Sequence, residues 1–250
     1  MFNNLGVRTG GKNSFTGGIE MYFHQLELLV EKGEVPAGCN ILLVGPSGSG
    51  KTVLCDTLLC EGLEVGQTCL YITMKMDPNL IRKNFLAGGV NLSKMEFLDC
   101  FTWLTGQSSE HYSIQNLTNL SELSVRLVAV AEKMGEGIFF ILDSVSNLCL
   151  YNVENTVLRF LEVNMARMKR NNNVGFYLVT QGIHSEAFYN GLRQMSDAVI
   201  EIRLREVENK IKREIRMHTF KFANHDTGWF PLIIDSNGKA SIGFNDEKII

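Results

Sequence analysis

The chain reads Gly45-Pro46-Ser47-Gly48-Ser49-Gly50-Lys51-Thr52 between a short apolar run and a helical pattern. The apolar run, Asn40 to Val44, suits a strand that is buried on both faces of a sheet. The residues from Thr52 to Leu63 predict a helix that ends near Gly66. The octet fits the pattern GxxxxGK[ST] completely, and a strand before it and a helix after it form the context in which that pattern binds phosphate.

This glycine-rich loop predicts a nucleoside triphosphate site with ATP and Mg²⁺ as the cofactors. Glycines let successive backbone N–H groups curve around an anion, and the following helix adds the positive end of its dipole. All eight residues are candidate nucleotide contacts, with Lys51 at the β- and γ-phosphates and the Thr52 hydroxyl on magnesium. The alternative is a chance glycine-rich turn, and the flanking strand and helix argue against it.

Two polar residues follow later apolar runs. Asp143 ends the run Ile138 to Leu142, and a carboxylate at that end of a strand can hold magnesium through water. Taken alone, such an aspartate is more often a cap or turn residue, but the loop upstream favours the metal role. Gln181 ends the run Leu178 to Thr180, where it is either a sensor of the γ-phosphate or an ordinary strand-end residue.

Strand patterns alternate with helical patterns along most of the chain, which predicts one α/β domain over residues 1–250. We expect a mostly parallel sheet with helices on both faces. The segment Gly17 to Gly33 has a spacing closer to helix than to strand. Near the C-terminus, Val199 to Arg205 and Ile211 to Phe222 alternate polar and apolar residues, which predicts an antiparallel β-hairpin.

Composition narrows the class of protein further. Hydrophobic residues make up 45% and charged residues 20%, so a sizeable core is available. The formal net charge of −3 gives no electrostatic reason to expect nucleic acid or an anionic membrane as a partner. Six scattered cysteines without a CxxC pair indicate a reducing, cytoplasmic setting. No apolar run approaches the ~20 residues of a membrane span, so we expect no membrane insertion.

The order of these pieces resembles the RecA/KaiC superfamily of P-loop ATPases, especially its archaeal single-domain KaiC-like members. Leu26-Glu27-Leu28-Leu29 with Gly33 to Gly38 resembles the family's LDELLxGGIPxG segment, and the octet has a common KaiC-like form of the Walker A loop. Leu142 to Leu148 is similar to the family's DSLSAL segment, and Ser196 to Ile200 to its ADGVI step. The resemblance spans roughly Gly17 to Gly238 and implies a RecA-like P-loop NTPase core.

One departure from the family concerns catalysis. KaiC-like ATPases usually carry paired glutamates after the second strand of the core, one of which activates the attacking water. This chain has Lys75 and Met76 at that place, and neither side chain can accept the proton at neutral pH. Asp77 is the nearest carboxylate and a weak candidate base, because its place before Pro78 favours an N-cap. The catalytic residue is therefore unknown, and we expect slow hydrolysis.

A second departure lies in the hairpin. KaiC-like subunits close a ring with a KMRG segment that reaches the neighbour's ATP, and here only Lys221 keeps a cation in that alignment. Lys221 is either a contact to a ring partner or a solvated strand residue. The archaellum motor's KaiC-like accessory subunit also looks to lack the glutamate pair, although its loop tends to differ from GPSGSGKT.

Three hypotheses of function remain open. The first is an ATP- and ADP-binding regulatory or assembly module that forms a homo-oligomer or ring and has an unknown protein partner. The second is an active ATPase of the KaiC or archaellum-accessory type. The third and least supported is a RecA-type DNA recombination protein, because Ser144 to Asn155 contains no Lys or Arg, and Gly182 to Met195 contains only Arg193.

Overall fold

A computed structural model describes residues 21–30, 33–106, 108, 110–222 and 224–244 of the chain. Within them, ten strands form one sheet in the order β12-β11-β10-β9-β3-β8-β7-β4-β5-β6. The strands are β3 (Asn40–Gly45), β4 (Cys69–Thr73), β5 (Met95–Asp99), β6 (Tyr112–Ser113), β7 (Phe139–Asp143), β8 (Val174–Thr180), β9 (Ala198–Val207), β10 (Lys210–Phe220), β11 (Phe230–Ile234) and β12 (Ala240–Ile242).

The sheet is parallel from β9 through β3 to β6, as the alternation of strands and helices predicts. Side chains of β3 alternate between its two faces: Ile41 and Leu43 belong to one hydrophobic cluster, and Leu42 and Val44 to the other. Strands buried on both faces read as continuous apolar runs, which is why the sequence located β3, β7 and the end of β8.

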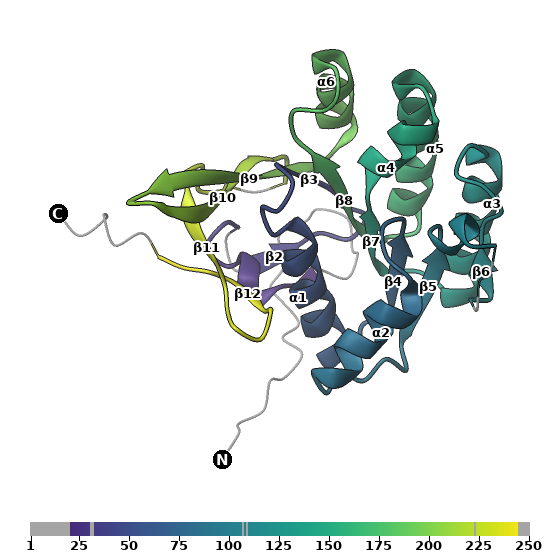
Figure 1. The fold of residues 1–250 in the computed structure, drawn as a ribbon, viewed down its shortest axis with the longest axis horizontal. Coiled ribbons are helices and arrows are strands. Elements are labelled where there is room, and N and C mark those ends of the chain that lie inside the picture. Colours follow the sequence, from purple (N-terminus) through teal and green to yellow (C-terminus); the bar gives the residue numbers. More distant parts are fainter. Residues whose placement is uncertain (1–20, 31–32, 107, 109, 223, 245–250) are drawn as a thin grey trace.

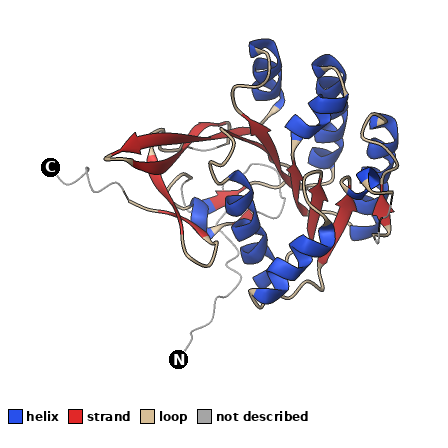
Figure 2. Ribbon diagram, in the orientation of Figure 1, coloured by secondary structure: helices blue, strands red, loops and turns tan. Residues whose placement is uncertain are grey.

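Helices cover both faces of the sheet (Figures 1 and 2). The helices α1 and α2 pack in the cluster that contains Ile41, and α3 to α6 pack in the cluster that contains Leu42. Their bounds are α1 (Lys51–Glu64), α2 (Pro78–Ala87), α3 (Leu120–Met134), α4 (Val145–Tyr151), α5 (Glu154–Arg170) and α6 (Glu186–Met195), with short 3₁₀ helices η1 (His24–Leu26) and η3 (Thr102–Leu104). The sequence patterns did not locate α4 or α6.

The predicted hairpin is confirmed as β9 and β10, which pair antiparallel around Glu208 and Asn209. Both turn residues have left-handed backbone angles, φ 52° and φ 57°, as a tight hairpin turn requires. The structure adds β11 and β12, so the antiparallel part of the sheet forms an arm that extends beyond the parallel strands (Figure 1).

The helix expected from Gly17 to Gly33 is wrong where the structure describes it; residues 17–20 and 31–32 lie outside the described residues. Here β1 (Met21–Tyr22) pairs antiparallel with β2 (Glu34–Val35), and η1 is a single short 3₁₀ turn rather than a long helix. Phe23 donates its backbone N–H to the Gly33 carbonyl at 3.0 Å. Phe23, Leu26 and Leu29 are buried, and they recur along the sequence at the spacing that is typical of a helix.

No helix among the described residues is long and apolar enough to cross a bilayer.

Candidate functional site

The glycine-rich loop Gly45–Thr52 connects the buried strand β3 to α1. Gly50 is the N-cap of α1 and has φ 96°, a left-handed conformation that favours glycine. A Cβ atom there would lie 2.8 Å from the Ile234 Cδ1 atom, so the arm packs closely against the loop. The N-terminus of α1 therefore carries backbone N–H groups and a helix dipole of the kind that binds anions.

Lys51 is buried and turned back onto the loop. Its Nζ atom donates to the carbonyl oxygens of Gly45 at 2.7 Å and of Pro46 at 2.8 Å. Burial and the neighbouring Lys75 lower the pKa of Lys51 to about 8, while Asp143 opposes that shift. The Lys51 ammonium is therefore held inside the loop. There the negative charge of an arriving phosphate would offset part of the hydration that the ammonium loses on burial.

Thr52 and Asp143 lie together, as the magnesium-site prediction needs. The Thr52 hydroxyl donates to Asp143 Oδ2 at 2.7 Å, although β8 lies between β3 and β7 in the sheet. A hydroxyl and a carboxylate supply the oxygen ligands that Mg²⁺ prefers. The two residues therefore fit a magnesium ion bound with triphosphate, and bound Mg²⁺ would offset phosphate charge there.

Lys75 contacts the other oxygen of the Asp143 carboxylate. Its Nζ atom lies 2.7 Å from Asp143 Oδ1, and its side chain is 39% exposed whereas that of Asp143 is 4% exposed. Sequence reasoning identified Lys75 only as the replacement of an expected glutamate and did not foresee this ion pair. The register could have revealed it, because Thr73 and Asp143 are direct partners across β4 and β7.

Asp77 is the N-cap of α2, as its place before Pro78 predicts. Its Oδ1 atom accepts a hydrogen bond from the Asn79 backbone N–H at 2.8 Å and caps α2. Gln181 directly follows β8, and its backbone N–H donates to the Gly45 carbonyl at 2.9 Å. The Gln181 side chain is exposed beside the glycine-rich loop, so the γ-phosphate sensor stays a prediction.

Asp56, on α1, was missed by the sequence reasoning. Burial and the nearby Asp143 raise the pKa of Asp56 to about 7, and the Tyr71 hydroxyl offsets that shift only in part. The Asp56 Oδ1 atom is buried and accepts no hydrogen bond from the described residues. The site thus contains a second carboxyl group, which is partly protonated near neutral pH.

A three-residue network joins the chain after β7 to the chain after β8. Ser146 Oγ lies 2.8 Å from His184 Nε2, and His184 Nδ1 lies 3.3 Å from Glu154 Oε1. Ser146 Oγ also accepts the Thr180 backbone N–H at 2.9 Å. Burial lowers the pKa of His184, and Glu154 opposes the shift. Hydrogen bonds and an ion pair therefore connect the residues that follow Asp143 to those around Gln181. Separately, the described residues contain no cluster of metal-ligand side chains.

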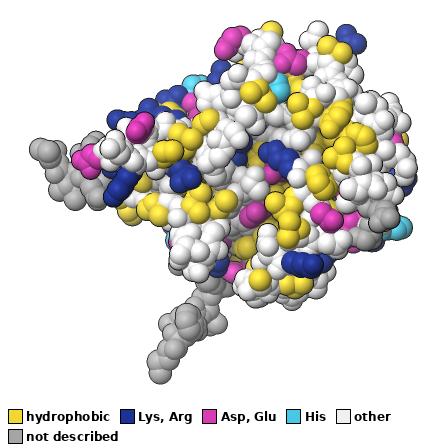
Figure 3. Space-filling view, viewed as in Figure 1, with side chains coloured by type: hydrophobic (Ala, Val, Ile, Leu, Met, Phe, Trp, Pro, Cys, Tyr) yellow, Lys and Arg dark blue, Asp and Glu magenta, His cyan; other side chains and the backbone are white. Residues whose placement is uncertain are grey.

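The hairpin arm carries charges of both signs (Figure 3). Arg216 pairs with Glu201 and Arg203 with Glu214, and both guanidinium groups lie over the Trp229 ring. Lys221 Nζ donates to the Gln194 carbonyl at 3.3 Å. These pairs neutralise much of the basic charge on the arm, which does not favour a nucleic-acid surface.

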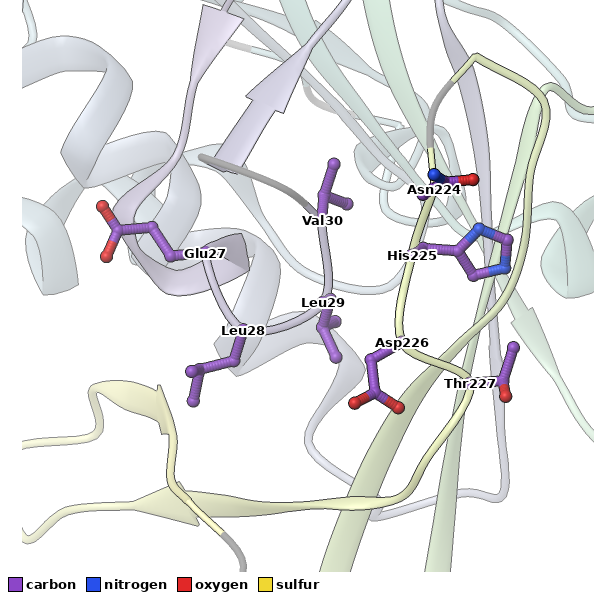
Figure 4. Close-up of a pocket in the computed structure, with 8 residues that line it drawn as sticks. All are labelled: Glu27, Leu28, Leu29, Val30, Asn224, His225, Asp226 and Thr227. Atoms are coloured by element: carbon purple, nitrogen blue, oxygen red, sulfur yellow. The ribbon is translucent and has the colours of Figure 1, made fainter.

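A separate hollow lies between the segment after η1 and the loop before β11 (Figure 4). Its lining side chains come from Glu27 to Val30 and from Asn224 to Thr227. Val30 and His225 form a β-bridge across it. None of these lining residues belongs to the glycine-rich loop, and Figure 4 shows no convergence of polar groups on a common point.

A parallel sheet with the glycine-rich loop after β3 and an acidic residue at the end of β7 defines the RecA-like α/β class of protein. A solved KaiC-like protein of Pyrococcus horikoshii shares this fold, with a TM-score of 0.69 at 16% identity over 90% of this chain and 99% of its own. The family model of the KaiC ATPase matches residues 18–245. The chain therefore belongs to the KaiC ATPase family, which implies nucleotide binding.

Curated relatives agree with this assignment. A UPF0273 protein of Methanopyrus kandleri is 28% identical over 230 residues, which cover 88% of this chain and 89% of the relative. A UPF0273 protein of Pyrococcus furiosus is 24% identical and matches 82% of this chain and 86% of its own length. The circadian clock protein KaiC3 of Synechocystis is 22% identical over 81% of this chain and 41% of its own length.

Proposed function

We propose that this protein is an ATP-binding regulatory or assembly module that hydrolyses ATP slowly. The observation that carries the proposal is the ion pair of Lys75 with Asp143, at the place where family members have a base. A protonated ammonium cannot take a proton from water, whereas a carboxylate can. The loop that binds ATP is complete, but the group that would activate the attacking water is missing.

Bound nucleotide would act on the rest of the molecule through neighbouring loops. Gln181 follows β8 beside the loop, and the Ser146–His184–Glu154 network continues from there to α4 and α5. A ligand shifts a conformational equilibrium only by its difference in affinity between two states. Contacts of the γ-phosphate with these loops would supply that difference between ATP and ADP, and thereby change the affinity for a partner or a second copy.

Titration with ATP and ADP, together with a turnover assay on the purified chain, tests the proposal. We expect ATP to bind, and turnover to stay well below the rate of about 1 s⁻¹ that is ordinary for enzymes. Lys51→Ala is the control, because it removes the cation placed for the phosphates and should abolish binding. Turnover of about 1 s⁻¹ or faster would refute slow hydrolysis, and absence of ATP binding would refute the whole proposal.

An active ATPase is the second candidate, since family members usually turn over ATP and Asp77 is a carboxylate two residues beyond Lys75. Asp77→Asn distinguishes the two, because the amide keeps an oxygen for the Asn79 N–H but cannot accept the proton of a water. Loss of turnover with an unchanged melting temperature would favour Asp77 as the base. Unchanged turnover would exclude that role.

A further inference from the structure

Both oxygens of the Asp143 carboxylate are occupied by residues of the chain itself. Thr52 donates to Oδ2, and the Lys75 ammonium lies 2.7 Å from Oδ1. Oδ1 has no hydrogen bond of good geometry among the described residues. Electrostatic attraction rather than a directional hydrogen bond therefore holds Lys75 against Oδ1. A contact of this kind can be exchanged for another cation at the same oxygen.

The fold places Lys75 there for a simple reason. Met74 donates its backbone N–H to the Asp143 carbonyl at 2.9 Å, which fixes the end of β4 beside the end of β7. The Thr73 hydroxyl donates to the Met76 carbonyl at 2.7 Å and closes a tight turn around Lys75. The backbone on both sides of Lys75 is thus held, while its partly exposed side chain reaches inward over Asp143.

The charge balance of the site follows from this placement. Lys51 and Lys75 are close enough for Lys75 to contribute to the lowered pKa of Lys51. With the Asp56 carboxyl protonated, two ammonium groups and the Asp143 carboxylate leave one net positive charge. A glutamate in place of Lys75 would leave one net negative charge, and metal-free triphosphate would then be repelled unless a divalent cation arrived with it.

We propose that Lys75 is a built-in cation of the nucleotide site that competes with magnesium for Asp143 and lowers the dependence of ATP binding on that metal. This inference rests on the proposed function, in that ATP must bind at the glycine-rich loop. With magnesium present, Asp143 and Thr52 would hold the ion, and Asp143 would give up its ion pair with the Lys75 ammonium. Without magnesium, Lys75 stays at the site and contributes the charge that faces the terminal phosphate.

The test compares the dissociation constant of ATP in excess Mg²⁺ with that in excess EDTA, by calorimetry on the full chain. Lys75→Met removes the charge and keeps the length of the side chain, and Lys75→Arg keeps the charge. Lys83→Met, on the exposed surface of α2, is the matched control. Thermal melts of all four proteins verify that each variant is folded.

We expect the ratio of the EDTA to the Mg²⁺ dissociation constant to be at least about fivefold larger in Lys75→Met than in the native chain, since couplings of about 5- to 150-fold are typical of linked sites. Lys75→Arg and Lys83→Met should keep the native ratio. Equal ratios in Lys75→Met and the native chain would overturn this inference while leaving ATP binding established. Loss of native ATP binding in both buffers would instead overturn the proposed function, and this inference with it.

Discussion

At the scale of single residues, the site contains more charge than the loop motif suggests. Lys75 and Asp143 shift the pKa of Lys51 in opposite directions, Asp143 raises that of Asp56, and Lys75 and Asp143 form an ion pair. The protonation of Lys51 and Asp56 therefore depends on what fills the site. A phosphate would stabilise Lys51 in its charged form, and a divalent cation would do the same for Asp56.

Asp56 gives this coupling a measurable consequence. Its carboxyl ionises near pH 4 in an unfolded chain but at about 7 in the fold, so between these values the folded state binds more protons. The free energy of unfolding must then fall as pH rises from about 4 to about 7. Asp56→Asn should remove that slope and stabilise the protein at pH 8, by on the order of 1 to 3 kcal/mol, with little gain near pH 4.

Urea unfolding at pH 4.5, 6 and 8 measures the effect of Asp56→Asn. Glu64→Gln, at the exposed end of the same helix, is the matched control and should leave the pH profile close to native. If Asp56→Asn lowered stability equally at all three pH values, the raised pKa would be the wrong explanation for the behaviour of this side chain.

Sequence reasoning reached the site only in part, and the particular residues show why. The glycine-rich loop and Asp143 were accessible because each lies at a fixed offset from a buried strand. The Thr52–Asp143 contact follows from both predictions, and the structure brings the two together. Lys75, Asp56 and the Ser146–His184 contact depend on strand order and register, which no local pattern encodes.

At the scale of elements, the same distinction holds. The parallel strands β3, β7 and β8 were located because burial on both faces makes them apolar throughout. The segment before β2 was read as a helix because its buried side chains recur at helical spacing, although pairing of β1 with β2 overrides that preference. The sequence pattern did not predict the short helix α4, because its seven residues give less than two turns of periodicity.

The contact between β7 and β8 offers a test of how tightly the sheet is packed. Gly175 lies directly opposite Phe140, and a Cβ atom on Gly175 would fall 2.1 Å from the Phe140 Cζ atom. Gly175→Ala should therefore destabilise the protein by about 1 to 3 kcal/mol through overpacking. Chemical unfolding of the purified variant gives the value.

A double mutant isolates the cause. Phe140→Leu shortens the side chain, so the Gly175→Ala change should cost less in that background than in the native one. Gly62→Ala in α1 is the control: its Cβ atom would meet neighbours at 3.4 Å, and alanine favours a helix over glycine. Additive effects of Gly175→Ala and Phe140→Leu would show that the two positions do not compete for space.

At the scale of the whole molecule, the antiparallel arm combines exposed apolar side chains with a contact to the glycine-rich loop. Large apolar side chains are exposed along it, including Ile211 at 65%, Ile233 at 52% and Phe222 at 47%. Such exposure is expected where a surface is covered by a partner. Because the arm also packs on Gly50 through Ile234, an assembly formed through the arm would be coupled to the nucleotide site.

We therefore expect the native chain to self-associate through the arm, with a mass that rises with concentration and more so with ATP than with ADP. Ile211→Asp should raise the dissociation constant of that assembly about tenfold or more, since it places a charge on an apolar contact worth at least ~1.4 kcal/mol. Val125→Asp, equally exposed at 67% on α3, is the matched control and should leave association unchanged. Sedimentation velocity over a concentration series measures both. A native chain that stayed monomeric with either nucleotide, or an Ile211→Asp variant that assembled like Val125→Asp, would show that the arm has another use.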